Sequence, residues 1–422
     1  MERGHINSEN AVMSASRIFL SAGEASGEHY GAALIPAMRR LVPNAEFFGL
    51  GGQRMEALGF RRIVRAEDVA IMGITEVILH MPRIYGEYRR LRGSIRQERP
   101  DLAILIDFPD VNLSLARHLR NAGVPVLYFV SPQLWAWKKY RIRDVQRYVD
   151  RMLVIFPFEE PFYRSNGVQA TFVGHPLADL PLPAISREDF ARENGLDPSK
   201  QWIGLLPGSR AKEIRLNLPE MVKAAQALQQ NDQYEFLLPL APTLTHAHRT
   251  EIKAMLPAGQ KFTLTSDARA TLHHARASVV ASGTATVEAG LIGNPFVVVY
   301  RVSPLSYAVA RRVVDVPHVA MVNLIANKRV VPELIQSDFT AANLVLHLQP
   351  LLNDEAARAE MQANLRRISD MLKASGSIDD PSGQTTPAET AIGRAAAVAA
   401  RMLHKPAPLQ HQIDQHEPDR LT

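Results

Sequence analysis

The chain has 422 residues, no cysteine, a formal net charge of +5 and 46% apolar residues. This length exceeds the size at which one hydrophobic core keeps growing, so we expect two domains. The absence of cysteine excludes disulfides, catalytic thiolates and cysteine-ligated zinc. The mild positive charge favours anionic partners without choosing among phosphates, nucleic acid and lipid surfaces.

The first half of the chain alternates short apolar runs with amphipathic segments. The runs predict strands at 17–23, 45–52, 101–108, 124–132 and 151–158. They lack polar alternation, which is typical of parallel strands covered by helices on both faces. The start of the chain lacks the apolar core of a signal peptide, and no segment resembles a transmembrane helix. We therefore expect a cytoplasmic protein whose contact with lipid is peripheral.

The second half restarts the same pattern after a proline-rich joint. Its predicted strands are 202–210, 235–242, 261–266, 277–283 and 294–300. The pattern predicts an α/β protein of two Rossmann-like domains facing a central cleft, with ligands at the carboxyl ends of the strands. We place the first domain at 1–175 and the second at 176–373. In 374–422 we expect a flexible loop, a helix that packs back on the first domain, and a polar tail.

The first predicted strand turns into a helix within GEASGEHYG (23–31). Gly23 allows a tight turn, and the helix N-terminus offers unpaired N–H groups to a ligand. The carboxylates of Glu24 and Glu28 favour a hydroxyl-rich sugar over a phosphate there. The alternative is a strand–helix turn with a purely structural role.

Two acidic residues follow the buried strand in IDFPDVN (106–112). A carboxylate at the carboxyl end of a parallel strand faces the ligand crevice and can accept the proton of an alcohol nucleophile. The alternative is that Asp110 or Asn112 caps the next helix. We expect one of the two aspartates to be a cap, and favour Asp107 over Asp110 as the base.

Two turns of the second half are candidates for donor binding. In LLPGSR (205–210), Gly208 and Ser209 close a strand–helix turn. The guanidinium of Arg210 can donate charged hydrogen bonds to a diphosphate. The alternative is that Arg210 is a solvated surface charge.

In SGTATVEAG (282–290), Gly283 and Thr284 present N–H and hydroxyl groups. Glu288, one turn into the following helix, could accept hydrogen bonds from ribose hydroxyls. The alternative is that Glu288 only complements the helix dipole.

Signatures of a metal site are missing from the sequence. No two aspartates stand two positions apart, and the histidine pairs 246/248 and 273/274 lack the helical spacing of a zinc site. We predict no metal and no cofactor, so helix N-termini and arginine would stabilise a leaving diphosphate.

Aromatic and basic residues are mixed in SPQLWAWKKYRIRDVQRYVDR (131–151). Trp135 and its neighbours would suit single-stranded nucleic acid, a sugar, an acyl chain or a phosphorylated acceptor. The alternative is that the basic residues form an ordinary solvent-exposed helix face. Because Glu24, Asp107 and Asp110 would repel a polyanion at the strand ends, we expect no nucleic-acid partner.

The segment 71–96 joins an apolar stretch to a basic one. This pattern suits an element that dips into an anionic membrane surface, and ordinary core packing of a helix is the alternative. The residues predicted to contact the membrane are Ile74, Val77, Ile78 and Leu79.

Taken together, GEASGE, MGITEV, IDFPDVN, SPQLWAW, PFE, GHP, LLPGSR, SGTAT and VNLIANKRVVPEL resemble the lipid-A-disaccharide synthase family. These are glycosyltransferases of the two-Rossmann-domain GT-B type, and the resemblance covers residues 17–351. Two departures stand out: Glu28 replaces the usual aspartate, and 374–387 has no recognised counterpart.

The resemblance implies transfer of diacylglucosamine from UDP-2,3-diacylglucosamine to the 6-hydroxyl of 2,3-diacylglucosamine 1-phosphate (lipid X), giving a β(1→6) disaccharide and UDP. It implies work on the cytoplasmic face of the inner membrane and leaves a homodimer open. The implied donor-site residues are Gly208, Ser209, Arg210, Gly283, Thr284, Glu288 and Asn323. The implied acceptor-site residues are Gly23, Glu24, Ser26, Asp107, Asp110 and Asn112.

Other functions are compatible with the same fold. A UDP-GlcNAc 2-epimerase or another UDP-sugar transferase would use the same cleft. A non-catalytic nucleotide- or nucleic-acid-binding module is the alternative from a different class.

Overall fold

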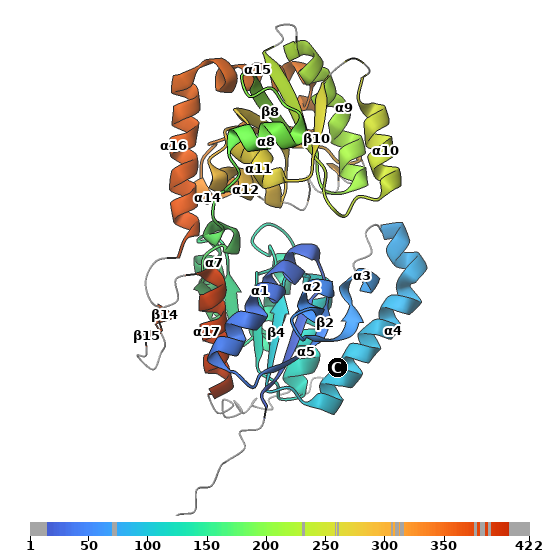
Figure 1. The fold of residues 1–422 in the computed structure, drawn as a ribbon. Coiled ribbons are helices and arrows are strands. Elements are labelled where there is room, and N and C mark those ends of the chain that lie inside the picture. Colours follow the sequence, from blue (N-terminus) through green and yellow to red (C-terminus); the bar gives the residue numbers. More distant parts are fainter. Residues whose placement is uncertain are drawn as a thin grey trace, which may run out of the picture.

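The computed structural model describes residues 15–69, 74–229, 233–257, 259, 261–304, 307–308, 312, 316–374, 378–379, 385–386 and 390–404. These residues form two large parallel β-sheets, each flanked by helices and drawn one above the other in Figure 1. The predicted α/β class with two Rossmann-like sheets is confirmed.

The first sheet has seven strands in the order β3-β2-β1-β4-β5-β6-β7. Its strands are β1 (Arg17–Ala22), β2 (Glu46–Gly51), β3 (Arg61–Arg65), β4 (Leu102–Ile106), β5 (Val126–Phe129), β6 (Arg151–Val154) and β7 (Ala170–Phe172). Its helices are α1 (Ala25–Leu41), α2 (Gln53–Glu56), α3 (Ala66–Val69), α4 (Ile74–Glu98), α5 (Pro109–Asn121), η1 (Lys139–Arg141), α6 (Ile142–Tyr148) and α7 (Glu159–Ser165).

The second sheet has six strands in the order β10-β9-β8-β11-β12-β13. Its strands are β8 (Gln201–Leu206), β9 (Tyr234–Pro239), β10 (Phe262–Thr265), β11 (Ala277–Ala281), β12 (Phe296–Tyr300) and β13 (Glu333–Ile335). Its helices are α8 (Arg187–Asn194), α9 (Ala211–Leu228), α10 (His246–Met255), α11 (Ala268–His274), α12 (Thr284–Ile292), α14 (Met321–Ala326), η4 (Gln336–Asp338), α15 (Ala341–Asn353) and α16 (Glu355–Leu372).

All ten predicted strands are present, but β3, β7 and β13 were not predicted. β3 reads RRIVR, so three arginines interrupt its apolar pattern, while β7 and β13 have only three residues each. All three lie at sheet edges or next to them, where local sequence carries the weakest signal. By contrast, all five residues of β4 are completely buried, as expected for a strand covered on both faces.

Both sheets have the same switch in strand order. β1 pairs with β2 on one side and β4 on the other, and β8 pairs in the same way with β9 and β11. The loops that follow β1 and β4, or β8 and β11, leave the sheet in opposite directions and open a crevice at the strand ends. Each domain therefore offers one ligand crevice.

The chain passes between the two domains twice. The first passage leads into η2 (Pro176–Asp179), and the second follows α16. The two passages touch where the His175 N–H donates to the Leu372 carbonyl at 2.8 Å. Burial lowers the pKa of His175 to about 3, so its imidazole is neutral at this joint.

The last helix, α17 (Ala391–His404), lies along α1 of the first domain (Figure 1). Its buried face is rich in alanine, which allows close approach of the two helices. The Ala391 N–H donates to the Asp179 carboxylate at 2.7 Å and ties the start of α17 to η2. Within the segment predicted as a loop, β14 (Ile378–Asp379) pairs with β15 (Thr385–Thr386), and the predicted polar tail lies outside the described residues.

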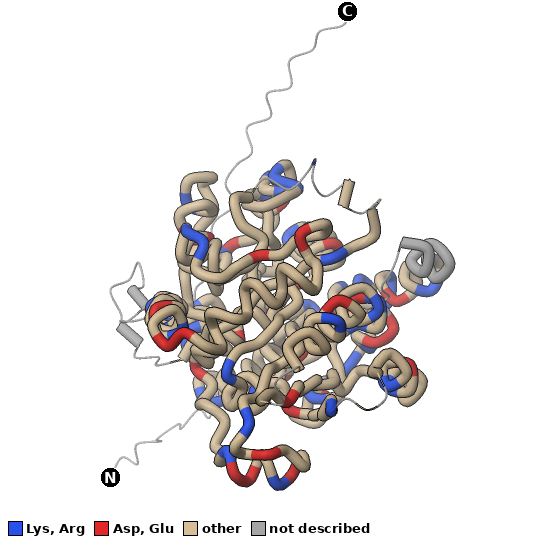
Figure 2. Tube along the Cα trace, turned by 90° about the horizontal axis from the view of Figure 1, so that it is seen from above, with Lys and Arg blue, Asp and Glu red and all other residues tan. Residues whose placement is uncertain are grey.

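Charged residues of both signs are interspersed along the chain in the view of Figure 2. In that view neither sign is confined to one part of the trace.

Candidate active site

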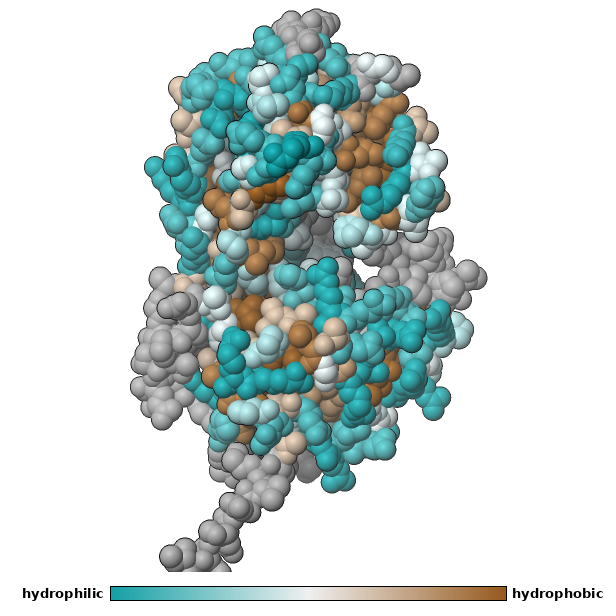
Figure 3. Space-filling model, viewed as in Figure 1, coloured by the Kyte–Doolittle hydropathy of each residue, from teal (hydrophilic) through white to brown (hydrophobic). Residues whose placement is uncertain are grey.

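The predicted site residues come from the four strand ends that border the two switch points. Gly23 and Glu24 follow β1, Asp107 follows β4, the 208–210 turn follows β8, and the 283–284 turn follows β11. Figure 3 shows the surface hollowed between the two domains. Tyr30 of α1 connects the two sides electrostatically, because the charges of both Asp107 and Glu288 help to raise its pKa after burial.

Asp107 is held in an unusual backbone conformation. It has φ of +49° and Phe108 has φ of +48°, both in the left-handed region that residues other than glycine rarely adopt. The Asp107 carbonyl accepts hydrogen bonds from the Tyr128 hydroxyl at 2.6 Å and from the Asn112 side-chain amide at 2.7 Å. Such strain persists only where surrounding contacts enforce it, and it clusters at functional sites.

The Asp107 carboxyl has the electrostatics of a general base. Burial and, to a smaller extent, the Glu24 charge raise its pKa to about 6, against the opposing effect of the Phe108 N–H. A carboxylate with this pKa is ionised at neutral pH and still basic enough to accept a proton in a transition state.

Asp110 differs from Asp107 in every respect that matters for proton transfer. Its side chain is 73% exposed and pairs with Arg141 at 2.5 Å and with Lys138 at 3.5 Å. Neither aspartate caps α5, because the N-cap position is Phe108 and no side chain caps it. The expectation of an aspartate cap was therefore wrong; Pro109, which has no N–H, begins the helix instead.

Asn112 is completely buried, which corrects the expectation that it contacts substrate directly. Its amide donates to the carbonyls of Ile106 and Asp107, and its oxygen accepts from the Ser21 hydroxyl at 2.6 Å. Every hydrogen-bonding group of this side chain serves the fold. Asn112 thus joins β1 to the turn that carries Asp107.

The turn after β1 requires glycine for packing reasons. A Cβ on Gly23 would lie 2.2 Å from the Phe108 ring, so the two strand-end turns are in tight contact. Glu24 occupies the N-cap position of α1 without capping it by its side chain, and Ser26 is partly exposed in the first turn. Glu28 instead accepts from the Arg54 N–H at 2.8 Å and so links α1 to α2.

Trp135 is held by a buried carboxylate that had not been assigned a role. Its indole N–H donates to Glu159 at 3.1 Å, and the Ser131 hydroxyl and the Phe156 N–H donate to the same carboxylate. Glu159 is 1% exposed, and burial raises its pKa to about 7. Its only sequence signal is its place in PFE directly after a strand.

In the turn after β8, an internal carboxylate occupies the expected phosphate position. Gly208 has φ of +128°, and a Cβ there would lie 2.5 Å from a Glu213 oxygen. The Ser209 N–H donates to Glu213 at 3.1 Å, and the Arg210 guanidinium lies 3.6 Å from the other Glu213 oxygen. Because the same N–H and guanidinium suit a phosphate, Glu213 stands where an anionic ligand would bind.

The turn after β11 leaves Gly283 and Thr284 exposed at the N-terminus of α12. Glu288, one turn further, is partly buried, and burial raises its pKa while Arg269 opposes the rise. The Arg269 Nη1 atom lies 3.9 Å from Glu288 and is buried without a hydrogen-bond partner. Arg269 was not predicted, because its proximity to Glu288 comes from the packing of α11 beside α12.

Asn323 is also completely buried, which corrects the expectation that its side chain contacts the sugar donor directly. Its amide donates to Glu333 at 2.8 Å, and its oxygen accepts from the N–H groups of Val330 and Val331. Glu333 in turn accepts from the Ala320 N–H at 2.9 Å. This network fixes the start of α14 and the strand β13.

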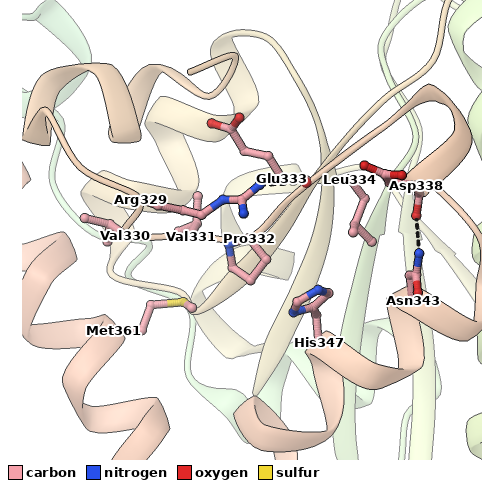
Figure 4. A pocket seen from close by; sticks show the side chains of 10 residues that line it. All are labelled: Arg329, Val330, Val331, Pro332, Glu333, Leu334, Asp338, Asn343, His347 and Met361. Carbon is pink, nitrogen blue, oxygen red and sulfur yellow. Dashed lines mark hydrogen bonds between the residues drawn. The ribbon is translucent and has the colours of Figure 1, made fainter. Parts of the chain in front are cut away.

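A separate cavity of about 400 Å³ lies between β13, α15 and α16 (Figure 4). His347, Met361 and Arg329 are among its lining residues, and none of these residues was predicted as part of the site. In Figure 4 the Glu333 carboxylate points away from His347, consistent with its bonds inside the network.

The four predicted membrane-contact residues all belong to α4, but their side chains lie outside the described part of the structure. No helix within the described residues combines the length and apolar character needed to cross a bilayer. Within the same residues, no cluster of three or more His, Asp or Glu side chains is arranged to hold a metal ion.

Comparison with known proteins gives a consistent result. The family model described as lipid-A-disaccharide synthetase matches residues 18–379. The chain is 65% identical to the lipid-A-disaccharide synthase of Acidobacterium capsulatum, covering 94% of this chain and 99% of that protein. It is 50% identical to the enzyme of the same name from Koribacter versatilis, covering 85% and 94%.

Solved structures resemble the chain in fold. A UDP-glucose:anthocyanidin 3-O-glucosyltransferase in complex with UDP has a TM-score of 0.60 at 12% identity, covering 92% of this chain and 99% of that one. A putative UDP-N-acetylglucosamine 2-epimerase from Listeria monocytogenes has a TM-score of 0.59 at 13% identity, covering 93% and 98%. The GT-B arrangement of two Rossmann-like domains is therefore confirmed, while identities this low carry no statement about substrate.

Proposed function

Because the chain belongs to the lipid-A-disaccharide synthase family, we propose that its cleft joins two acylated glucosamines. The chain is a glycosyltransferase of lipid A biosynthesis. The donor is UDP-2,3-diacylglucosamine, held at the strand ends of the second domain. The acceptor is 2,3-diacylglucosamine 1-phosphate, held at the strand ends of the first.

The reaction is a direct displacement with inversion. Asp107 accepts the proton of the acceptor 6-hydroxyl while that oxygen bonds to the anomeric carbon of the donor. The bond from that carbon to the diphosphate breaks on the opposite face, and its electron pair leaves with UDP. The observation that carries this assignment is a partly buried carboxyl with a raised pKa of about 6 at the switch point of the first sheet.

The charge that develops on UDP is stabilised by the second domain. Arg210 and the N–H groups at the starts of α9 and α12 interact with the diphosphate after Glu213 has swung away. Glu288 accepts hydrogen bonds from the ribose. Removal of one preorganised stabiliser of this kind costs about 2.7–4 kcal/mol of barrier.

An assay of UDP release with both acylated glucosamines tests the proposal. We expect release only when donor and acceptor are both present, and the same rate with and without EDTA. Asp107→Ala should abolish turnover, while Asp110→Ala, which removes a mostly exposed carboxylate of the following helix α5, should retain most of kcat at saturating acceptor. Near-normal turnover by Asp107→Ala would remove the base assignment, and loss of activity in EDTA would overturn metal-independent transfer.

The alternative of a 2-epimerase is favoured only by the shared fold. The same preparation, given UDP-GlcNAc alone, should form no epimer. Epimer formation without an acylated acceptor would replace the transferase assignment.

Peripheral membrane contact is the second part of the proposal. Ile78 and Leu79 lie in the apolar part of α4, and a helix that is apolar at one end and basic at the other suits an anionic bilayer surface. Replacing both by Ser should lower partition onto anionic vesicles, while Leu346→Ser, a 62% exposed apolar residue of the second domain, should not. Equal partition of both variants and the wild type would retire the idea.

A further inference from the structure

A small apolar slot lies in the first domain between α4 and α5. Its volume is about 200 Å³, and its surface is mostly apolar. The carbon atoms that line it come from Leu50 at the end of β2, from Ile84, Tyr85, Tyr88 and Leu91 on α4, and from Val111 on α5. Leu50 and Leu91 are almost completely buried and form its floor, while Tyr85 is 57% exposed.

Hydrogen bonds between α4 and α5 fix the spacing of the two helices that line the slot. The Tyr88 hydroxyl bonds to the Ser114 hydroxyl at 2.6 Å and to the His118 ring at 3.1 Å. These bonds fasten α4 to α5 and satisfy the only polar atom of the Tyr88 side chain. The ring is therefore fixed in place, with the Arg92 guanidinium over it at 6.0 Å from the ring centroid, and the Tyr88 carbons remain part of the slot lining.

Two cations lie next to the one charged residue that lines the slot. Asp110 lines the slot and pairs with both Lys138 and Arg141, so two positive charges face one carboxylate. Asp110 also stands in the first turn of α5, directly after the turn that carries Asp107. An apolar slot whose single lining carboxylate is outnumbered by two neighbouring cations matches an amphiphile that has an anionic head.

We propose that this slot binds one acyl chain of the acceptor, while Lys138 and Arg141 interact with its phosphate. The inference rests on the proposed function, because it assumes an acylated, phosphorylated acceptor. It adds a location and a reason for chain-length preference. Each methylene withdrawn from water contributes about 0.8 kcal/mol, so affinity should change about fourfold for each methylene that the slot covers.

Acceptors with a graded series of acyl-chain lengths test the slot at a fixed donor concentration. In the wild type, acceptor KM should fall about fourfold per added methylene until the slot is full, with kcat nearly constant. Ile84→Trp places a larger side chain in the slot. It should raise KM for the long-chain acceptor about tenfold or more and leave KM for the shortest acceptor unchanged. Leu346→Trp, on the exposed face of α15, is the matched control and should follow the wild type.

Tyr85→Ala provides a second variant, because this exposed side chain contributes little to the core. It should remove part of one wall and flatten the dependence of KM on chain length. Unchanged chain-length dependence in folded Ile84→Trp and in Tyr85→Ala would overturn the slot while leaving the transferase intact. If the chain-length dependence of KM is unchanged but both variants partition less onto vesicles, the slot contacts the membrane and does not bind the acceptor. Absence of UDP release by the wild type with every acceptor would overturn the proposed function itself, and the slot with it.

Discussion

The two turns that carry the proposed chemistry are built in opposite ways. The turn of Asp107 in the first domain is partly buried, held in a left-handed conformation and fastened by Asn112 and Tyr128. The turn of Arg210 in the second domain is exposed, with the arginine side chain 53% accessible and paired only loosely with Glu213. The first turn is thus organised before any ligand binds, whereas the second carries an internal anion, Glu213, at the position where we propose that the diphosphate binds.

This difference has a physical cause. A general base works by its position and its pKa, and burial provides both at a cost in folding stability. A diphosphate site needs unpaired N–H groups and a cation, which stay solvated until the ligand arrives. The comparison therefore predicts the largest effect at the base of the first domain, followed by loss of leaving-group stabilisation in the second domain, and the smallest effect on UDP binding alone.

The largest effect is expected from Asp107→Asn, which keeps the shape of the side chain and removes the base. Turnover should fall about 10²- to 10⁴-fold. In the wild type, kcat/KM should rise with pH up to about 6 and then level off, because the carboxyl must be ionised to accept a proton. Persistence of that rise in the residual activity of Asp107→Asn would contradict the assignment.

The same variant should be more stable than the wild type at neutral pH. The pKa of Asp107 is higher in the folded state than in the unfolded chain, so its contribution to stability is full below pH 4 and lost as pH rises through about 6. The loss corresponds to about 3 kcal/mol. Thermal unfolding at pH 4 and pH 8 should show Asp107→Asn gaining on the wild type mainly at the higher pH, because the loss builds up between about pH 4 and pH 6. An equal difference at both would argue against a strained, ionised base.

Arg210→Ala should have the next largest effect. Loss of one stabiliser of the leaving diphosphate should lower kcat about 10²- to 10³-fold. Arg215→Ala, whose guanidinium pairs with Glu251 on the neighbouring α10, is a matched control from the same helix and should be nearly silent. Comparable losses in both variants would point to helix α9 as a whole rather than to a specific phosphate contact.

Asn112→Ala tests whether the hydrogen bonds of Asn112 hold the Asp107 turn in place. The change leaves the Ser21 hydroxyl and the Asp107 carbonyl with fewer partners, which should cost about 1–3 kcal/mol of stability. It should lower kcat more than it changes acceptor KM, because the displaced group is the base. A loss of stability with unchanged kcat at low temperature would show that the Asn112 side chain does not position Asp107.

The smallest effect is expected from Glu213→Gln. Without the competing negative charge, UDP should bind a few-fold more tightly, since exposed ion pairs contribute only about 0–1 kcal/mol. Titration calorimetry with UDP measures this directly, and Glu220→Gln, further along α9, is a suitable control. Weaker UDP binding by Glu213→Gln would show that the carboxylate supports the turn instead of occupying the ligand position.

The sequence by itself determined the class of fold, the two parallel sheets and the four turns at their switch points. It did so because buried parallel strands leave a local apolar signature, and because the carboxyl ends of such strands converge wherever the order reverses. Glycine positions such as Gly23 and Gly208 were also readable, since a tight turn demands them. The family motifs added the identity of the substrates.

Only the tertiary structure decided which polar side chains serve the fold and which remain for a ligand. Asn112 and Asn323 lie in motif positions, yet the side chain of each is fully engaged in hydrogen bonds to other segments of the chain. Glu159, Glu213 and Arg269 gained their places through contacts that sequence spacing does not encode. Hydrogen-bond partners are chosen when separate segments pack together, so the division between support and chemistry is a property of the assembled molecule.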